Sequence, residues 1–169
     1  FRSATTDPLI NPTLVMAAVN SGYRERRGAL LIGCDPAEYG DDRTAIAFRQ
    51  GRTVFRIEYH TKKGPMEVAG ILANYWHEHR PDALFVDKIG VGSGIVDRLK
   101  ELNIPVIGVN SAERANDAER YANKRAEMWD RMRKWFDDKP VKIEDDEELQ
   151  VELTCVGRRP PDSLGRLLL

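Results

Sequence analysis

Cysteine and histidine are scarce in this sequence. Its 169 residues include only two cysteines, Cys34 and Cys155, and three histidines, His60, His77 and His79. Neither set has the spacing of zinc ligands, and two cysteines do not make a disulfide framework. We therefore expect no zinc site, and we interpret the two thiols as reduced cysteines of a cytosolic protein.

Long apolar runs and an excess of positive charge are also missing. No apolar run approaches the roughly 18 residues needed to cross a membrane, and no signal peptide is recognisable. Lysine and arginine total 26 against 27 acidic residues, so the net charge is −1. This balance argues against a strongly basic nucleic-acid binder, although it leaves room for a local basic face. A Walker A motif is absent as well, which argues against a P-loop ATPase.

The composition is that of a folded domain. Hydrophobic residues make up 41% of the chain and charged residues 31%, and 169 residues are enough for one domain with a full core. The sequence opens with Phe1 rather than methionine and stops within the apolar run 167–169. We therefore expect both ends to be cuts in a longer polypeptide.

An apolar run that ends in a carboxylate is the most informative stretch. Residues 30–34 suit a buried strand, Asp35 follows them, and the next residue is a proline that cannot continue the ladder. An acidic turn with Asp41 and Asp42 leads to a second apolar run at 44–48. A carboxylate at the tip of a buried strand is costly unless a cation meets it. We therefore treat Asp35 as a candidate cation ligand.

Alternating and helical periodicities predict the remaining elements. They are, in order, a short helix at 12–19, strands at 29–35, 43–49 and 53–59, a helix at 66–79, a strand at 83–87, a helix with Ile95, Val96, Leu99 and Leu102 inward, and a strand at 104–109. A mobile loop at 111–119, a long helix from Tyr121, an acidic helix at 145–153 and a hairpin at 154–169 complete the chain. The long helix carries an apolar stripe that we expect in the core, namely Met128, Trp129, Met132, Trp135 and Phe136.

This order of elements predicts an α/β fold. Three strands in an antiparallel meander, followed by strands that pair in parallel through right-handed crossovers, make a mixed five-stranded sheet with helices on both faces. The strand that ends in Asp35 is then central, and the strand that ends in Asp87 lies parallel beside it. Ligands of open α/β sheets collect at the carboxyl ends of strands. We therefore expect Asp35 and Asp87 to meet at one end of the sheet.

Two carboxylates on neighbouring strands repel each other unless a cation compensates them. Oxygen ligands suit Mg²⁺ or Mn²⁺, and two such ions about 4 Å apart activate a water and stabilise the leaving oxygen in phosphodiester hydrolysis. Our hypothesis is therefore metal-dependent phosphodiester hydrolysis, with Asp35 and Asp87 as metal ligands and Asp42 as a third, water-bridged one. An ordinary alternative stays open, in which these acids are turn or capping residues. For Asp41 we favour that ordinary role.

A glycine-rich turn, Gly90-Val91-Gly92-Ser93-Gly94, follows the strand that ends in Asp87. Its spacing is GxGxG rather than the GxGxxG of dinucleotide-binding folds, and no acid ends a strand about 20 residues further on. Two interpretations remain. The turn is either flexible, with amides that approach a phosphate backbone, or purely structural.

Basic residues of the long helix are the remaining candidates for contact with nucleic acid. Lys124, Arg125 and Arg131 either reach DNA or form a solvated helix face, and the sequence favours neither. His77 and His79 lie at a predicted helix end, where exposure to solvent is the simplest expectation.

Several motifs follow one another in a specific order. They are Gly33-Cys34-Asp35-Pro36-Ala37 with Gly40-Asp41-Asp42-Arg43-Thr44, Phe85-Val86-Asp87 with the glycine-rich turn and Ile95-Val96-Asp97-Arg98-Leu99, Val106-Ile107-Gly108-Val109-Asn110, and Tyr121-Ala122-Asn123-Lys124-Arg125-Ala126-Glu127-Met128-Trp129. The series, which spans about 29–169, resembles the nuclease domain of tailed-phage terminase large subunits. The resemblance implies a ribonuclease-H-like fold and a two-metal endonuclease that uses Mg²⁺ or Mn²⁺. It also implies that Asp35 and Asp87 are the first two catalytic acids.

The resemblance further implies a biological setting. Such nucleases cut concatemeric double-stranded viral DNA during genome packaging, in the bacterial host cytoplasm, with a terminase small subunit and a portal protein as partners. Their ATPase motor lies N-terminal to the nuclease. By this resemblance, residues 1–27 are a tail and short helix that link to a missing ATPase domain, and residues 28–169 are the nuclease domain.

The family's third catalytic acid lies beyond a strand that resembles residues 165–169, and Asp162 is a poor substitute for it. We therefore expect an incomplete site in this chain, with weak or no cleavage and at most one well-bound metal. Three rivals remain: another ribonuclease-H-like nuclease of resolvase or transposase type, an actin-like ATPase, and a non-catalytic prophage remnant that binds DNA or a portal protein. The poor phosphate loop at 38–40 argues against the ATPase.

Overall fold

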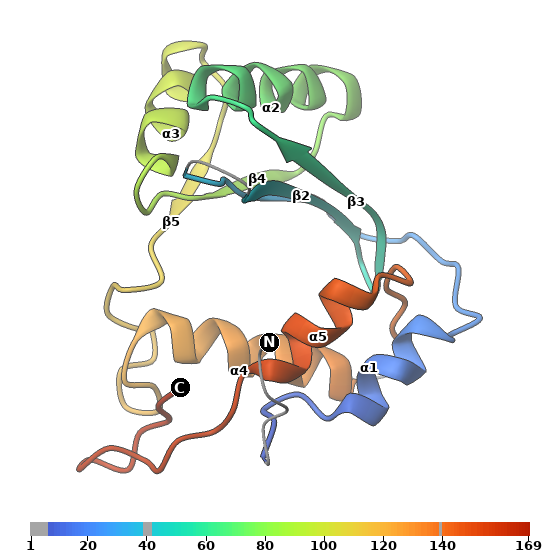
Figure 1. Ribbon diagram of the computed structural model, residues 1–169, viewed down its shortest axis with the longest axis vertical. Coiled ribbons are helices and arrows are strands. Elements are labelled where there is room, and N and C mark those ends of the chain that lie inside the picture. The colour runs from blue at the N-terminus through green and yellow to red at the C-terminus, as the bar shows by residue number, and fades with distance from the viewer. Residues whose placement is uncertain (1–6, 39–41, 139) are drawn as a thin grey trace. The chain divides into compact units, whose positions relative to one another are not determined.

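The computed structural model describes residues 7–38, 42–138 and 140–169, and the chain divides into two compact units (Figure 1). The sheet unit comprises Glu25–Asn110, and the helical unit comprises Phe1–Arg24 with Ser111–Leu169. The predicted division of the chain at residue 28 stays a prediction.

The sheet unit contains the predicted mixed five-stranded sheet, in the order β3-β2-β1-β4-β5. Its strands are β1 (Leu30–Asp35), β2 (Arg43–Gln50), β3 (Thr53–Thr61), β4 (Ala83–Asp87) and β5 (Ile107–Val109). The pairs β1–β2 and β2–β3 are antiparallel, and the pairs β1–β4 and β4–β5 are parallel. The predicted sheet is therefore confirmed, with β1 at its centre.

The last strand is shorter than the predicted 104–109. Ladder pairing starts only at Ile107, opposite Phe85. The backbone N–H of Ile104 instead donates to the carbonyl oxygen of Leu99 at 2.9 Å, and Pro105 has no N–H to give to a ladder. The chain therefore leaves the preceding helix through a short connection before it joins the sheet.

Helices α2 (Pro65–His79) and α3 (Gly92–Glu101) pack on one face of this sheet. The fully buried side chains of this core come from the strands and from both helices, and include Ile32, Ile46, Phe48, Val68, Leu72, Leu84, Val86, Ile95 and Leu99. The predicted inward orientation of Leu102 is wrong, because this residue is 42% exposed. It lies at the C-cap of α3, where the helix has already ended.

The helical unit contains α1 (Pro12–Val19), α4 (Lys124–Asp137) and α5 (Glu147–Cys155). Each helix starts at a capping side chain, because Asn11, Asn123 and Asp146 accept a backbone N–H of the first turn. The predicted start of the long helix at Tyr121 is therefore two residues too early for its cap. Among the described residues, no helix is long and apolar enough to span a bilayer.

The buried face of α4 differs from the predicted apolar stripe. Of that stripe, Phe136 is buried, whereas Met128 is 42% exposed. The other buried residues of α4 are Ala126 and the two acids Glu127 and Asp130. The sequence-based prediction failed here because both carboxylates are surrounded by hydrogen-bond donors, which allows their burial.

The predicted hairpin at 154–169 forms only in part. The chain folds back, because the N–H of Arg159 donates to the carbonyl oxygen of Leu168 at 3.3 Å and the N–H of Asp162 to that of Arg166 at 3.1 Å, but these residues are not strands. A tight turn does occur at Asp162–Arg166, close to the predicted place, with Asp162 accepting the N–H of Leu164 and of Arg166. Beyond it, Leu167 forms a parallel bridge to Tyr121 instead of a hairpin ladder. The residues predicted as a mobile loop, 111–119, are tied to the start of α4, because Ser111 and Glu113 accept backbone N–H groups of Arg125 and Lys124.

Candidate metal centre

Asp35 and Asp87 lie at the same level of two adjacent strands. The parallel register of β1 and β4 pairs Leu31 with Ala83 and, at its last step, Cys34 with Val86. The same offset carries Asp35 to the level of Asp87. Neighbouring strands lie about 4.8 Å apart, so the two backbones are close enough for both carboxylates to reach one bound cation.

Both acids point to the sheet face opposite the core of this unit. Side chains alternate along a strand, and the preceding residues Cys34 and Val86 are buried under α2 and α3. Asp35 is exposed and Asp87 is half-buried. The two carboxylates therefore share one face and one end of the sheet, as expected from the sequence.

The thiol beside Asp35 does not compete as a metal ligand. Burial, with a smaller contribution from the Asp35 charge, raises the pKa of Cys34 to about 12. A thiol must lose its proton to bind a metal, so Cys34 stays a neutral core residue at neutral pH. The donor set at this edge is consequently made of carboxylate oxygens, which suits Mg²⁺ or Mn²⁺.

The backbone around Asp87 fixes the orientation of its side chain. Asp87 pairs with Val109 on β5, and its Oδ1 accepts the N–H of Ile89 at 2.9 Å. This is the turn-capping role that the sequence left open for Asp87. It also fixes one carboxylate oxygen and so restricts the directions in which the other can bind a cation.

The glycine-rich turn after Asp87 has a structural reason at two of its glycines. Gly90 has a positive φ of 59°, and a Cβ there would overlap the carboxylate of Glu38. A Cβ at Gly92 would overlap the carbonyl group of Asp87, whose carbon lies 2.8 Å from that position. Gly94 has nothing within 4 Å of its Cβ position. At Gly90 and Gly92 the purely structural interpretation is therefore the better one.

Glu38 was missed by the sequence analysis. Its carboxylate lies against Gly90, so the loop after β1 meets the loop after β4. Glu38 follows no apolar run directly and has no periodic signal, so only the folded chain reveals this proximity. Asp42 is exposed one residue before β2, and Asp41 lies outside the described residues. Within the described ranges, no three acidic, cysteine or histidine side chains are grouped closely enough to hold a metal.

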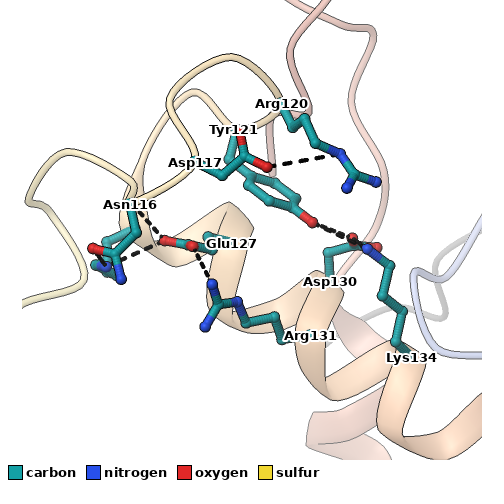
Figure 2. Close-up of polar contacts among 9 residues, drawn as sticks. Asn116, Asp117, Arg120, Tyr121, Glu127, Asp130, Arg131 and Lys134 are labelled. Carbon is teal, nitrogen blue, oxygen red and sulfur yellow. Dashed lines mark hydrogen bonds and ion pairs between the residues drawn. The ribbon is translucent and has the colours of Figure 1, made fainter.

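Two of the three basic candidates on α4 are occupied by a buried acid (Figure 2). Lys124 Nζ and Arg131 Nη2 contact the carboxylate of Glu127 at 3.2 and 2.7 Å. Arg125 is exposed. Arg131 also stays 63% exposed despite its ion pair, whereas the Lys124 side chain is only 18% exposed, so the solvated interpretation fits Arg125 and Arg131 but not Lys124.

The histidines do not gather near Asp35 and Asp87. His77 is exposed, whereas the ring of His79 packs edge-on against Phe48 at 5.4 Å. The expectation of a solvated His79 is therefore wrong. His60 Nε2 lies 3.3 Å from Glu58 on β3.

Comparison with known proteins gives a result only at the level of structure. No family model and no curated protein sequence matches the chain. The nuclease domain of the large terminase subunit gp2 of bacterial virus Sf6 has a similar structure, with a TM-score of 0.80 and 21% identity over 96% of this chain and 87% of that one. The large terminase nuclease of thermophilic phage G20c gives a TM-score of 0.68 at 12% identity, over 96% and 88%.

Related structures of both domains contain metal. The K428A mutant of the Sf6 domain was solved with manganese, at a TM-score of 0.75 and 20% identity over 96% of this chain and 87% of that one. The G20c nuclease was solved with magnesium, at a TM-score of 0.66 and 14% identity over 97% and 87%. At these identities the likeness establishes the fold, which is the ribonuclease-H-like fold of phage terminase nucleases.

Proposed function

We propose that this chain is the nuclease domain of a phage terminase large subunit, and that it hydrolyses phosphodiester bonds of double-stranded DNA with the help of divalent metal ions. The observation that supports this most directly is the β1–β4 register, which brings Asp35 level with Asp87 at the carboxyl ends of adjacent parallel strands. The fold it shares with metal-bound phage terminase nucleases adds support.

The residues at this edge fit a hard divalent cation. Asp35 is exposed and so accessible to a metal ion and to a phosphate group. Asp87 is oriented through the N–H of Ile89, and the neighbouring thiol of Cys34 stays protonated. When bound, Mg²⁺ or Mn²⁺ would supply an activated water and stabilise the leaving oxygen. The chain's own contribution is to hold the two carboxylates in place and to present them at an open rim.

The partners follow from the same proposal. The substrate is concatemeric double-stranded viral DNA. An ATPase domain of the same polypeptide, a terminase small subunit and a portal protein act with the nuclease in the host cytoplasm. Asp42, at the entrance to β2, is proposed as an outer ligand that binds a metal-bound water. These assignments rest on the terminase resemblance.

A second candidate has one observation in its favour. The described residues contain no group of three potential metal-binding side chains. A remnant that binds DNA or a portal protein without cutting DNA would need none. The two candidates differ in a measurable way, because only the nuclease requires tight metal binding by Asp35 and Asp87.

The test is metal binding and plasmid nicking by four matched proteins. We expect calorimetry to detect Mn²⁺ binding to the wild-type chain. In Asp35→Asn and Asp87→Asn the affinity for Mn²⁺ should be lower than in wild type by about tenfold or more, because an amide cannot supply the charge that holds the ion. Asp97→Asn, at an exposed position of α3, removes the same charge and should bind like wild type. Mn²⁺-dependent nicking of supercoiled plasmid, which we expect to be weak because the site is incomplete, should follow the same order, and metal binding is therefore the primary measurement. Equal binding by all four proteins would refute the proposed site.

A further inference from the structure

The three glycines of the 90–94 turn lie in unlike surroundings. Gly92 is buried at the first position of α3, and a Cβ there would overlap the backbone carbonyl of Asp87. The same Cβ would lie 3.3 Å from Cγ of Pro36. Gly94 is two residues later in the same helix, and its Cβ position is open.

These contacts place Gly92 between the ends of the two acid-bearing strands. Asp87 is the last residue of β4, and Pro36 directly follows Asp35, the last residue of β1. The first turn of α3 therefore packs against the backbone of one candidate ligand and against the residue next to the other. A side chain at position 92 cannot be fitted unless the Asp87 carbonyl group or the start of α3 shifts, because that group is backbone and has no rotamer to change.

Contacts within the protein therefore explain why residue 92 is a glycine. The space above its Cα is filled by the Asp87 carbonyl and Pro36, and a phosphate group could not enter there. Gly90 differs in kind, since its positive φ and its contact with the Glu38 side chain explain its identity. Among the three glycines, only Gly92 would bring a Cβ against the backbone of a candidate metal ligand.

We propose that Gly92 is a positioning residue that sets the spacing and orientation of the Asp35 and Asp87 carboxylates. This inference rests on the proposed function. A displaced Asp87 backbone changes the short turn in which Oδ1 accepts the Ile89 N–H, and so reorients the carboxylate. Mg²⁺ demands near-ideal octahedral geometry with bonds of about 2.0–2.1 Å, and it responds to such a shift more strongly than a larger ion does.

The test compares Gly92→Ala with Gly94→Ala, the same chemical change two residues apart in one helix. We expect Gly92→Ala to weaken Mg²⁺ binding by about tenfold or more, as loss of a supporting contact to a ligand typically does. Mn²⁺ binding should weaken less, so the ratio of the two dissociation constants changes. Gly94→Ala should stay within about twofold of wild type for both ions, because its new methyl group meets nothing. Thermal unfolding is followed in parallel.

The change in metal preference separates positioning from a merely structural role. Global destabilisation reduces the folded fraction and affects both ions alike, whereas a displaced ligand alters their ratio. An unchanged ratio in folded Gly92→Ala would overturn the inference. So would a loss of equal size in Gly94→Ala.

Should Gly92→Ala fail to fold, Pro36→Ala tests the same contact without adding an atom. It removes the Cγ that packs near Gly92, and it should weaken Mg²⁺ binding more than Mn²⁺ binding. Wild-type binding of both ions would overturn the inference. Failure of the proposed function looks different, because Asp35→Asn and Asp87→Asn would then bind metal like wild type.

Discussion

The hydroxyl of Tyr121 donates a hydrogen bond of 2.7 Å to Oδ2 of Asp130, across the junction between the 111–123 loop and α4 (Figure 2). Lys134 Nζ and Arg133 Nε complete the surroundings of this carboxylate, each at 2.9 Å. Burial alone would raise the pKa of Asp130. The donors from Tyr121, Lys134 and Arg133 outweigh burial and lower the pKa from 3.8 to about 2.

This lowered pKa predicts acid sensitivity. The stabilisation by ionised Asp130 is fully present above pH 3.8 and is lost as the pH falls toward about 2. Its size is roughly 2 kcal/mol at neutral pH, because each tenfold change in proton affinity corresponds to about 1.4 kcal/mol. We expect urea unfolding of Asp130→Asn to show lower stability than wild type at pH 7, with a gap that narrows between pH 4 and about 2. Asp138→Asn, which changes an exposed carboxylate, should show no such narrowing.

Glu127 is the other buried acid of α4, with 1% exposure. Burial alone would raise its pKa, but the N–H of Asn116 at 2.8 Å, Lys124 and Arg131 together lower it, so the carboxylate is ionised. Glu127→Ala should lower the free energy of unfolding by roughly 2–3 kcal/mol, because a backbone N–H and two cations lose their common partner. Hydrogen exchange at the Asn116 amide should accelerate. Glu119→Ala, at an exposed position of the same loop, should change neither the free energy of unfolding nor the exchange rate of the Asn116 amide. An equal loss of stability in both variants would contradict the stabilising role of Glu127.

Tyr75 and Glu58 form a second polar contact, in the sheet unit, where the Tyr75 hydroxyl donates to Glu58. Burial, followed by the hydrogen bond and charge of Glu58, raises the pKa of Tyr75 from 10.0 to about 12. Because the folded pKa is the higher one, this contribution to stability is constant below pH 10 and is lost as the pH rises toward 12. A rapid alkaline pH jump followed by phenolate absorbance should show an ionisation near pH 12 that disappears in Tyr75→Phe. Tyr23→Phe should retain it.

The sheet could be predicted because its strands have clear local sequence patterns. The runs 30–34 and 83–86 are apolar and end in acids, and one topological rule, the right-handed crossover, then makes those strands parallel neighbours. The β1–β4 register, whose offset puts Asp35 level with Asp87, needed no more than these runs and that rule. The predicted bounds of a strand were wrong where a single residue prevented ladder pairing. Pro105 is the example, because β5 begins at Ile107 instead of the predicted residue 104.

The polar interior of the helical unit could not be predicted in the same way. Acidic residues such as Glu127 and Asp130 are normally expected on the solvent-exposed face of a helix. Their burial depends on hydrogen-bond donors such as Asn116 and Tyr121, which precede the helix. Glu38 also escaped detection, because its contact with Gly90 joins two loops that are distant in sequence. Hydrophobic periodicity predicts which apolar residues are buried, but it does not show which carboxylates are hydrogen-bonded in the folded chain.

Asp42 offers the sharpest remaining test of the candidate site. It is exposed, lies one residue before β2 and is seven positions beyond Asp35, so it can reach a bound ion only from the rim of the sheet. A carboxylate that acts through a metal-bound water contributes less than a direct ligand, so Asp42→Asn should weaken Mn²⁺ binding by about three- to tenfold, a smaller loss than that of Asp35→Asn. Calorimetric titration of both variants beside Asp97→Asn measures this order. A loss equal to that of Asp35→Asn would make Asp42 a direct ligand, and wild-type binding would remove Asp42 from the site, because neither result is compatible with a ligand in the outer sphere.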